Sequence, residues 1–224
     1  MSSDTRSAIQ SGPALEIWLA TRLDTAFDEA MLTPDEHARY RRLRSPRKRK
    51  EFELSRTLLH RLAPTTKTFS LSHSGGLAAL ALDRSGRAFG MDLEVHKARD
   101  VISLARFAFD PEEAAALARH PTALQLFYDL WVLKEACAKA LGLNLVDALR
   151  ECVFRIEDGI VGGRLPTRTE WRAYVWRARP DISLGAVVLG SEQPFSVRQI
   201  EWPMESAASW LETATAAGGG ATLL

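Results

Sequence analysis

LFYDLWVLKEACAKAL, residues 126–141, is the stretch of this sequence that decides the fold. At 100° per residue, Trp131, Glu135 and Lys139 follow one another along one side of a helix. The opposite side carries an apolar stripe made of Leu126, Leu130, Leu133, Cys137, Ala140 and Leu141. The pattern predicts a long helix, about Leu124–Leu141, whose stripe packs on the core. Its polar side is either an exposed face with one Glu–Lys pair, or a second buried surface or a site.

Strand candidates and one further helix surround this segment in the sequence. Asp110-Pro111-Glu112-Glu113 predicts a helix start, because it combines an N-cap acid, a proline and a glutamate at the capping-box position. Asp158-Gly159 is typical of a hairpin turn. The predicted strands are Phe89–Val95, Cys152–Ile156, Ile160–Leu165, Trp171–Ala178 and Ile182–Leu189.

The first third of the chain contains the same kinds of element in the same order. Ala14–Leu19 predicts a strand, Thr33-Pro34-Asp35-Glu36 predicts a capped helix start, and Arg47–Leu62 predicts a second helix. Phe69–Leu82 predicts a strand that is interrupted at Gly75-Gly76 by a turn or bulge.

This repetition predicts an α+β fold class with two similar halves. We expect an N-terminal half at residues 13–86 and a C-terminal half at residues 87–205, which carries an extra hairpin. Residues 1–12 and 206–224 are expected to be flexible termini.

The composition is that of an ordinary globular protein. Of 224 residues, 46% are hydrophobic and 25% are charged, which excludes a disordered or collagen-like chain. A formal net charge of +1 gives no overall preference for nucleic acid or membranes. Cys137 and Cys152 are too few for a disulfide framework or a zinc site. No apolar run approaches the roughly 20 residues of a membrane span and none resembles a secretion signal, so we expect a cytoplasmic protein.

Asp92 and Glu94 lie two residues apart on a predicted strand, so both side chains point the same way while Leu93 enters the core. Two neighbouring carboxylates repel each other unless a cation lies between them, and Mg²⁺ prefers such oxygen ligands. The pair indicates either a metal site or a solvated strand edge.

Residues 70–76, SLSHSGG, combine hydroxyls, one histidine and two glycines. They suit a turn with a hydrogen-bonded histidine, a loop that binds phosphate, or a catalytic serine, although the leading glycine of G-x-S-x-G is missing.

Eight positive charges lie within twelve residues of the N-terminal half. This run could bind nucleic acid, a phosphorylated cofactor or an acidic protein surface, or it could be a solvated helix face. It comprises Arg39, Arg41, Arg42, Arg44, Arg47, Lys48, Arg49 and Lys50.

Taken in order, these motifs resemble those of the 4′-phosphopantetheinyl transferases, in the branch that activates surfactin and enterobactin synthetases. The resemblance spans about Ser45 to Leu189 and implies a monomer of two α+β subdomains related by a pseudo-twofold axis, with the active site at their interface. The matching stretches are S-H-S-G at 72–75, G-x-D-x-E at 90–94, Phe109-x-x-Glu112, and the most specific one, W-x-x-K-E-x-x-x-K at 131–139.

The resemblance implies that the phosphopantetheine arm of coenzyme A is moved to a serine of an acyl or peptidyl carrier protein. Release of 3′,5′-ADP and dependence on Mg²⁺ are implied as well. An acidic carrier domain is the expected partner, from fatty acid, polyketide or nonribosomal peptide synthesis, and neither nucleic acid nor membrane is expected to bind. By similarity, Asp92, Glu94 and Glu135 would ligate Mg²⁺, coenzyme A would contact Lys48, Arg56, Ser72, His73 and Lys139, and the catalytic residues would be Glu135, Lys139 and Glu112.

The motifs leave several points open. The proton of the attacking serine could go to Glu135, to Glu112 or to a metal-activated water. Lys134, on the flank of the helix, could pair with a carboxylate. The G-K-P motif of many family members is absent before the S-H-S loop, and Leu143-Asn144 replaces a second glycine after Gly142.

Three other functions are compatible with parts of the sequence. The basic run would suit a nucleic-acid-binding module, although Tyr40 is its only aromatic residue. Ser72 or Ser74 would serve a serine acyl hydrolase. A transferase-like protein that only binds carriers is the third, and the intact acidic residues argue against it.

Overall fold

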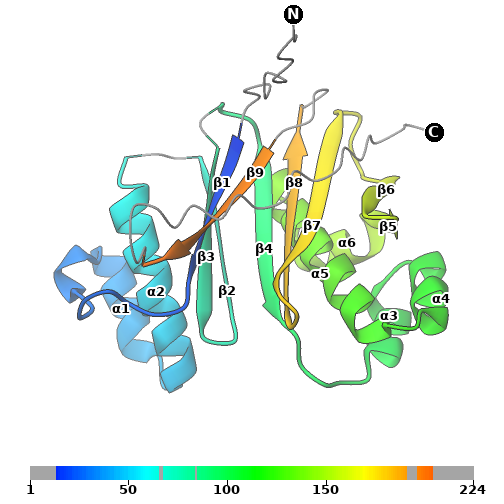
Figure 1. Ribbon diagram of the computed structural model, residues 1–224. Coiled ribbons are helices and arrows are strands. Elements are labelled where there is room, and N and C mark those ends of the chain that lie inside the picture. The colour runs from blue at the N-terminus through cyan, green and yellow to red at the C-terminus, as the bar shows by residue number, and fades with distance from the viewer. Residues whose placement is uncertain (1–13, 66–67, 84, 191–195, 204–224) are drawn as a thin grey trace, which may run out of the picture.

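The computed structural model of the chain describes residues 14–65, 68–83, 85–190 and 196–203. Its strands form two sheets and a separate hairpin (Figure 1). The first sheet has the order β2 (Phe69–Ser74), β3 (Leu77–Asp83), β1 (Ala14–Ala20) and β9 (Ser196–Trp202). The second sheet has the order β4 (Phe89–Val95), β8 (Ile182–Leu189) and β7 (Trp171–Arg179), and the hairpin joins β5 (Val153–Glu157) to β6 (Ile160–Arg164).

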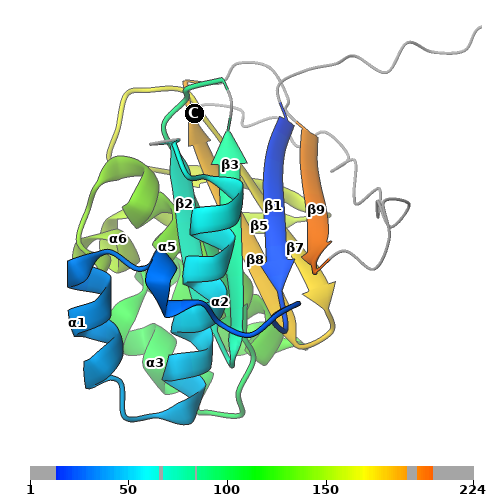
Figure 2. The same cartoon turned by 90° about the vertical axis from the view of Figure 1, so that its left-hand side faces the viewer.

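Helices cover the outer face of each sheet. The first sheet is covered by α2 (Pro46–Leu62), which Figure 2 shows lying along the strands, and α1 (Pro34–Arg42) packs on α2 through Tyr40 and Phe52. Beside the second sheet are α3 (Val101–Ala108), α4 (Pro111–Arg119), α5 (Ala123–Leu141) and α6 (Leu145–Glu151). None of the helices in the described ranges combines the length and the apolar composition needed to cross a membrane.

The inner faces of the two sheets share one apolar core. Alternate residues of β1, namely Leu15, Ile17 and Leu19, pack with Met91 and Leu93 of β4. Trp18 and Ala20, which alternate with them on β1, face the other way, toward α2, as the two-residue period of a strand requires. The molecule is therefore layered helix, sheet, sheet, helix.

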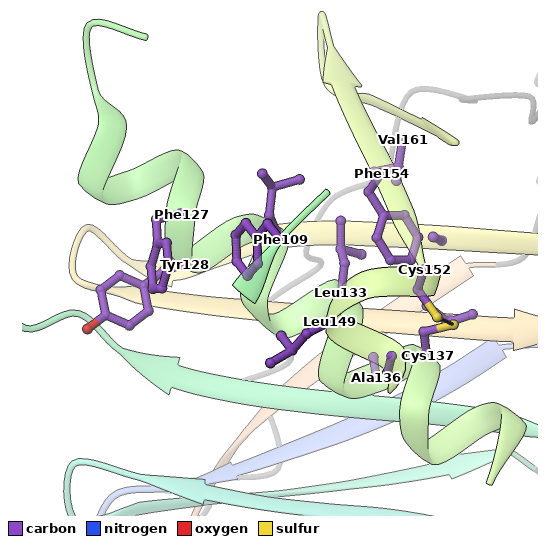
Figure 3. Close-up of a cluster of buried hydrophobic side chains, with 14 of the residues drawn as sticks. Phe109, Phe127, Tyr128, Leu133, Ala136, Cys137, Leu149, Cys152, Phe154 and Val161 are labelled. Carbon is purple, nitrogen blue, oxygen red and sulfur yellow. Dashed lines mark hydrogen bonds between the residues drawn. The ribbon is translucent and has the colours of Figure 1, made fainter. Parts of the chain in front are cut away.

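The long helix α5 is buried on more than its expected stripe. Its apolar side chains pack with α3, α4, α6 and the β5–β6 hairpin, as Figure 3 shows for Phe127, Leu133 and Cys137. The thiols of Cys137 and Cys152 are both buried in this core, with 2.9 Å between their sulfur atoms. On the side toward the sheet, α5 lies against β4 so closely that a Cβ atom at Gly90 would be 2.0 Å from the carbonyl oxygen of Ala136.

Most predicted elements are found, with bounds shifted by one or two residues. The predicted strand Phe69–Leu82 is two strands, β2 and β3, because Gly75 and Gly76 adopt φ of 62° and 85° and form a two-residue hairpin turn. Helices α3 and α6 and strand β9 were not predicted.

The expected division at residues 86 and 87 stays a prediction, and the pairing of one strand differs from it. Strand β9 falls in the expected C-terminal half, 87–205, but it pairs in parallel with β1 and so belongs to the first sheet. The reason is that β3 occupies only one edge of β1. The pseudo-twofold relation between the halves stays a prediction, and the expected flexible termini, 1–12 and 206–224, lie outside the described residues.

Candidate active site

The two sheets meet along a polar seam between β2 and β4, the edge strands that carry the S-H-S and G-x-D-x-E motifs. The two strands belong to different sheets, and serine side chains join them. Ser70, Ser72 and Ser74, here called the serine ladder, point from β2 and accept hydrogen bonds from the backbone N–H groups of Met91, Leu93 and Val95 at 2.9, 3.3 and 3.2 Å. The serine hydroxyls therefore accept the backbone N–H groups at this edge of β4, although β2 and β4 do not form a continuous sheet.

Three carboxylates meet beside this seam. Asp92 and Glu94 project from β4 toward α5, and Glu135 projects from α5 toward them. One oxygen of each lies within 4.8 Å of the others, and we call these residues the acid cluster. Gly90 makes this meeting possible, because any larger residue there would push α5, and Glu135 with it, away from β4.

The electrostatics of the acid cluster are unfavourable without a positive partner. Burial, together with repulsion from Asp92, raises the pKa of Glu135 to about 7, although Lys139 opposes the shift. Burial also raises the pKa of Glu94, and Asp92 adds to the shift while the hydrogen bond from Ser74 opposes it. The Oδ2 atom of Asp92 is buried and has no hydrogen-bond partner among the described residues. Three hard oxygen donors with an unpartnered buried oxygen fit a divalent cation such as Mg²⁺.

Lys139 lies one turn beyond Glu135 and crosses the seam. Its ammonium group donates to Asp92 Oδ1 at 2.8 Å, to the carbonyl of Met91 at 2.9 Å and to the carbonyl of Leu71 at 3.3 Å. It therefore ties α5 to both edge strands and brings one positive charge to the acid cluster.

Trp131, one turn before Glu135, fixes that carboxylate. Its indole N–H donates to Glu135 Oε1 at 3.0 Å, and its ring stacks on Phe127. The W-x-x-x-E spacing thus has a physical reason, since residues four apart on a helix are neighbours.

A cavity of about 260 Å³ opens between the two halves next to Glu94. Its cationic side chains come from both sides: Arg47 from α2, and Lys97 and Arg99 from the loop after β4. His73 and Ser74 of β2 and the aromatic residues Phe127, Tyr128 and Trp131 of α5 complete the lining with Glu51. A cavity with this charge can accept an anion beside the acid cluster.

Glu51 organises the N-terminal side of the cavity. It is buried on α2, accepts the backbone N–H of Gly76 at 2.8 Å, and lies 3.5 Å from Nδ1 of His73 and 3.7 Å from Nε of Arg47. One carboxylate therefore holds the hairpin turn and orients two side chains of the cavity.

The structure brings some of the expected site residues together and leaves others apart. Ser72, His73, Lys139 and the acid cluster lie together at the seam. Their meeting was implied by the resemblance and not by the strand and helix patterns. The other three expected residues belong neither to the acid cluster nor to the cavity lining. Lys48 is exposed on α2, Arg56 pairs with Glu36 at 2.9 Å, and Glu112 is exposed and pairs with Arg155 at 2.7 Å.

Lys134 has a structural environment rather than a place in the cavity. It is fully buried, pairs with Glu113 at 2.7 Å, and donates to the carbonyls of Leu149 and Cys152. The expected pairing of Lys134 with a carboxylate is confirmed, and Glu113 is the partner.

Four residues that line or organise the cavity were not predicted from the sequence as parts of a site. Arg47 was recognised only as part of the basic run, from which the resemblance singled out Lys48 instead. Glu51, Lys97 and Arg99 gave no signal, because nothing in their spacing shows that α2 and the loop after β4 approach each other.

Comparisons with known proteins point to one superfamily. Residues 88–186 match the 4′-phosphopantetheinyl transferase superfamily. The chain is 36% identical over 101 residues to the 4′-phosphopantetheinyl transferase of Bacillus subtilis, a stretch that covers 44% of this chain and 44% of that protein. It is 28% identical over 123 residues to the phosphopantetheinyl transferase of Thraustochytrium sp., covering 49% of this chain and 42% of that protein. The alignments thus span less than half the length of each relative. Residues 88–186, which contain Asp92, Glu94 and all of α5, are thus the part of the chain that is similar to the 4′-phosphopantetheinyl transferase superfamily.

Proposed function

We propose that the protein is a 4′-phosphopantetheinyl transferase of the surfactin-type branch, which moves the phosphopantetheine arm of coenzyme A to a serine of an acyl or peptidyl carrier protein. The observation that carries the proposal is the acid cluster, in which Asp92, Glu94 and Glu135 meet beside a cavity with cationic walls. In the reaction the serine hydroxyl attacks the β-phosphorus of coenzyme A, and 3′,5′-ADP leaves.

The acid cluster would hold Mg²⁺, which when bound neutralises charge on the pyrophosphate oxygens. Lys139 adds a positive charge 2.8 Å from Asp92. The cavity residues Arg47, Lys97 and Arg99 would hold further phosphate oxygens, so that the substrate is positioned between the two halves. Most of the catalysis would then be positioning and charge neutralisation.

The environment of α2 supports an anionic substrate. Its first turn contains several cations and no acid, which is unfavourable next to the positive end of the helix dipole unless an anion binds there. Lys48 is exposed in this turn and could meet the nucleotide end of coenzyme A, whereas Arg56 would first have to leave Glu36.

The placement of the two candidate bases favours one of them. Glu135 belongs to the acid cluster, and Glu112 is held at the surface by Arg155. We therefore assign the acceptance of the serine proton to Glu135.

Intact-mass spectrometry tests the reaction. An apo-carrier incubated with coenzyme A, Mg²⁺ and this protein should gain about 340 Da, the mass of the added arm, and 3′,5′-ADP should appear in equal amount. Glu135→Gln should abolish the gain without lowering the unfolding temperature, because it removes one of three repelling carboxylates. Glu112→Gln, the matched control, should retain most of the gain. If neither an acyl carrier nor a peptidyl carrier is modified, the proposal is overturned.

A further inference from the structure

The serine ladder does more than accept the backbone N–H groups of β4. All three hydroxyls accept a backbone N–H of β4, but their protons go to different acceptors. Ser70 donates to the carbonyl of Met91 at 3.2 Å, whereas Ser72 donates to Asp92 Oδ1 at 2.7 Å and Ser74 donates to Glu94 Oε2 at 2.6 Å. Two of the three serine hydroxyls therefore donate to carboxylates of the acid cluster.

A hydroxyl group has one proton to donate. Because each Oγ accepts a backbone N–H, the orientation of its own O–H bond is restricted, and the proton is directed to the neighbouring carboxylate. Ser72 thus has no proton left for a phosphate oxygen, which differs from the phosphate contact that the resemblance implies for it. Both serines are buried, at 8% and 6% exposure, so water does not compete strongly for these bonds.

We propose that Ser72 and Ser74 are positioning residues of the acid cluster, which hold one oxygen of Asp92 and one of Glu94 and thereby present the other oxygen of each to a divalent cation. The proposal rests on the proposed function only in that the acid cluster binds a metal. It is supported by the unpartnered Oδ2 of Asp92, the oxygen that Ser72 and Lys139 leave free. Partners that orient metal ligands in this way typically contribute ten- to a hundredfold to metal affinity.

Ser70 provides a matched control within the same ladder. Replacing any of the three serines with alanine removes the acceptor of one β4 N–H, so Ser70→Ala, Ser72→Ala and Ser74→Ala should lower the unfolding temperature by similar amounts. Only Ser72→Ala and Ser74→Ala also release a carboxylate. A role confined to the seam would affect all three variants alike.

The test measures binding of Mn²⁺ alone to the full chain, by electron paramagnetic resonance of the free ion. We expect one site in the wild type, its loss in Glu135→Gln, about tenfold weaker binding in Ser72→Ala and Ser74→Ala, and wild-type affinity in Ser70→Ala. Wild-type affinity in Ser72→Ala and Ser74→Ala, or equal weakening in all three, would overturn the positioning role while the metal site stands. If the wild type binds no Mn²⁺, the metal site of the proposed function fails, and the positioning role fails with it.

A second pair of variants covers the case in which the alanine variants do not fold. Ser72→Cys and Ser74→Cys keep nearly the same volume but replace a strong donor with a weak one. Severalfold weaker Mn²⁺ binding in both would support the positioning role, and unchanged binding would contradict it.

Discussion

Glu36 and Glu135 are both partly buried carboxylates, yet their surroundings shift the pKa in opposite directions. Burial alone would raise the pKa of Glu36, but the N–H of Thr33, His60 and Arg56 outweigh burial and lower it. For Glu135, burial and Asp92 raise the pKa to about 7. Glu36 has Arg56 and two hydrogen-bond partners built into the fold, whereas Glu135 has too little positive charge around it, as expected where a ligand supplies the missing charge.

The lowered pKa of Glu36 predicts a pH-dependent contribution to stability. Its folded pKa lies below the ordinary value, so the contribution is fully present above that value and is lost as the pH falls through the folded pKa. Glu36→Gln should cost about 1 kcal/mol at pH 7, the difference between charged and neutral hydrogen bonds, and the cost should disappear as the pH falls through the lowered folded pKa of Glu36. Urea unfolding across this range measures it. Asp35→Asn, in the same first turn, is the control, because it shares the helix dipole but lacks the pairing with Arg56; a constant cost for Glu36→Gln would contradict the prediction.

Among the elements, α5 and β4 were predictable and their approach was not. The period of α5 and the alternation of β4 are local patterns, and they placed Glu135, Asp92 and Glu94 on the correct faces. Helices α3 and α6 have only eight and seven residues, too few for a clear period. Likewise, the bond from Ser72 to Asp92 depends on how two sheets meet, which no local spacing records.

The contact at Gly90 fixes how close α5 lies to β4. An added Cβ would be 2.0 Å from the carbonyl oxygen of Ala136, a backbone atom that cannot turn aside. Gly90→Ala should therefore cost about 3 kcal/mol or more of unfolding free energy, and it should weaken Mn²⁺ binding because Glu135 moves with α5. Gly162→Ala, on a strand with nothing within 4 Å of the added Cβ, should be nearly neutral. Equal unfolding midpoints in urea for the two variants would contradict this prediction.

At the scale of the whole molecule, the shared core makes the two sheets one cooperative unit. Residues from β1 and β3 pack with residues from β4, β7 and β8 in a single cluster. Lys139 links α5 to β2, and β9 carries the chain back from the second sheet to the first. The acid cluster lies at the edge of this core, so its geometry depends on both sheets being folded.

The return of β9 to the first sheet can be tested by removing it. A chain that ends at Gly190 lacks Ile200, which is 1% exposed, and leaves one edge of β1 unpaired. Loss of Ile200 burial alone should cost about 2 kcal/mol, and Ile200→Ala in the full chain, which keeps the backbone pairing, should cost less than the truncation. Because the core is shared, urea unfolding followed by circular dichroism and by tryptophan fluorescence should give coincident transitions in all three proteins. Two separate transitions in the full chain would instead mean that the sheets unfold independently, and then the expected halves, 13–86 and 87–205, would describe the folding units better than the observed strand order does.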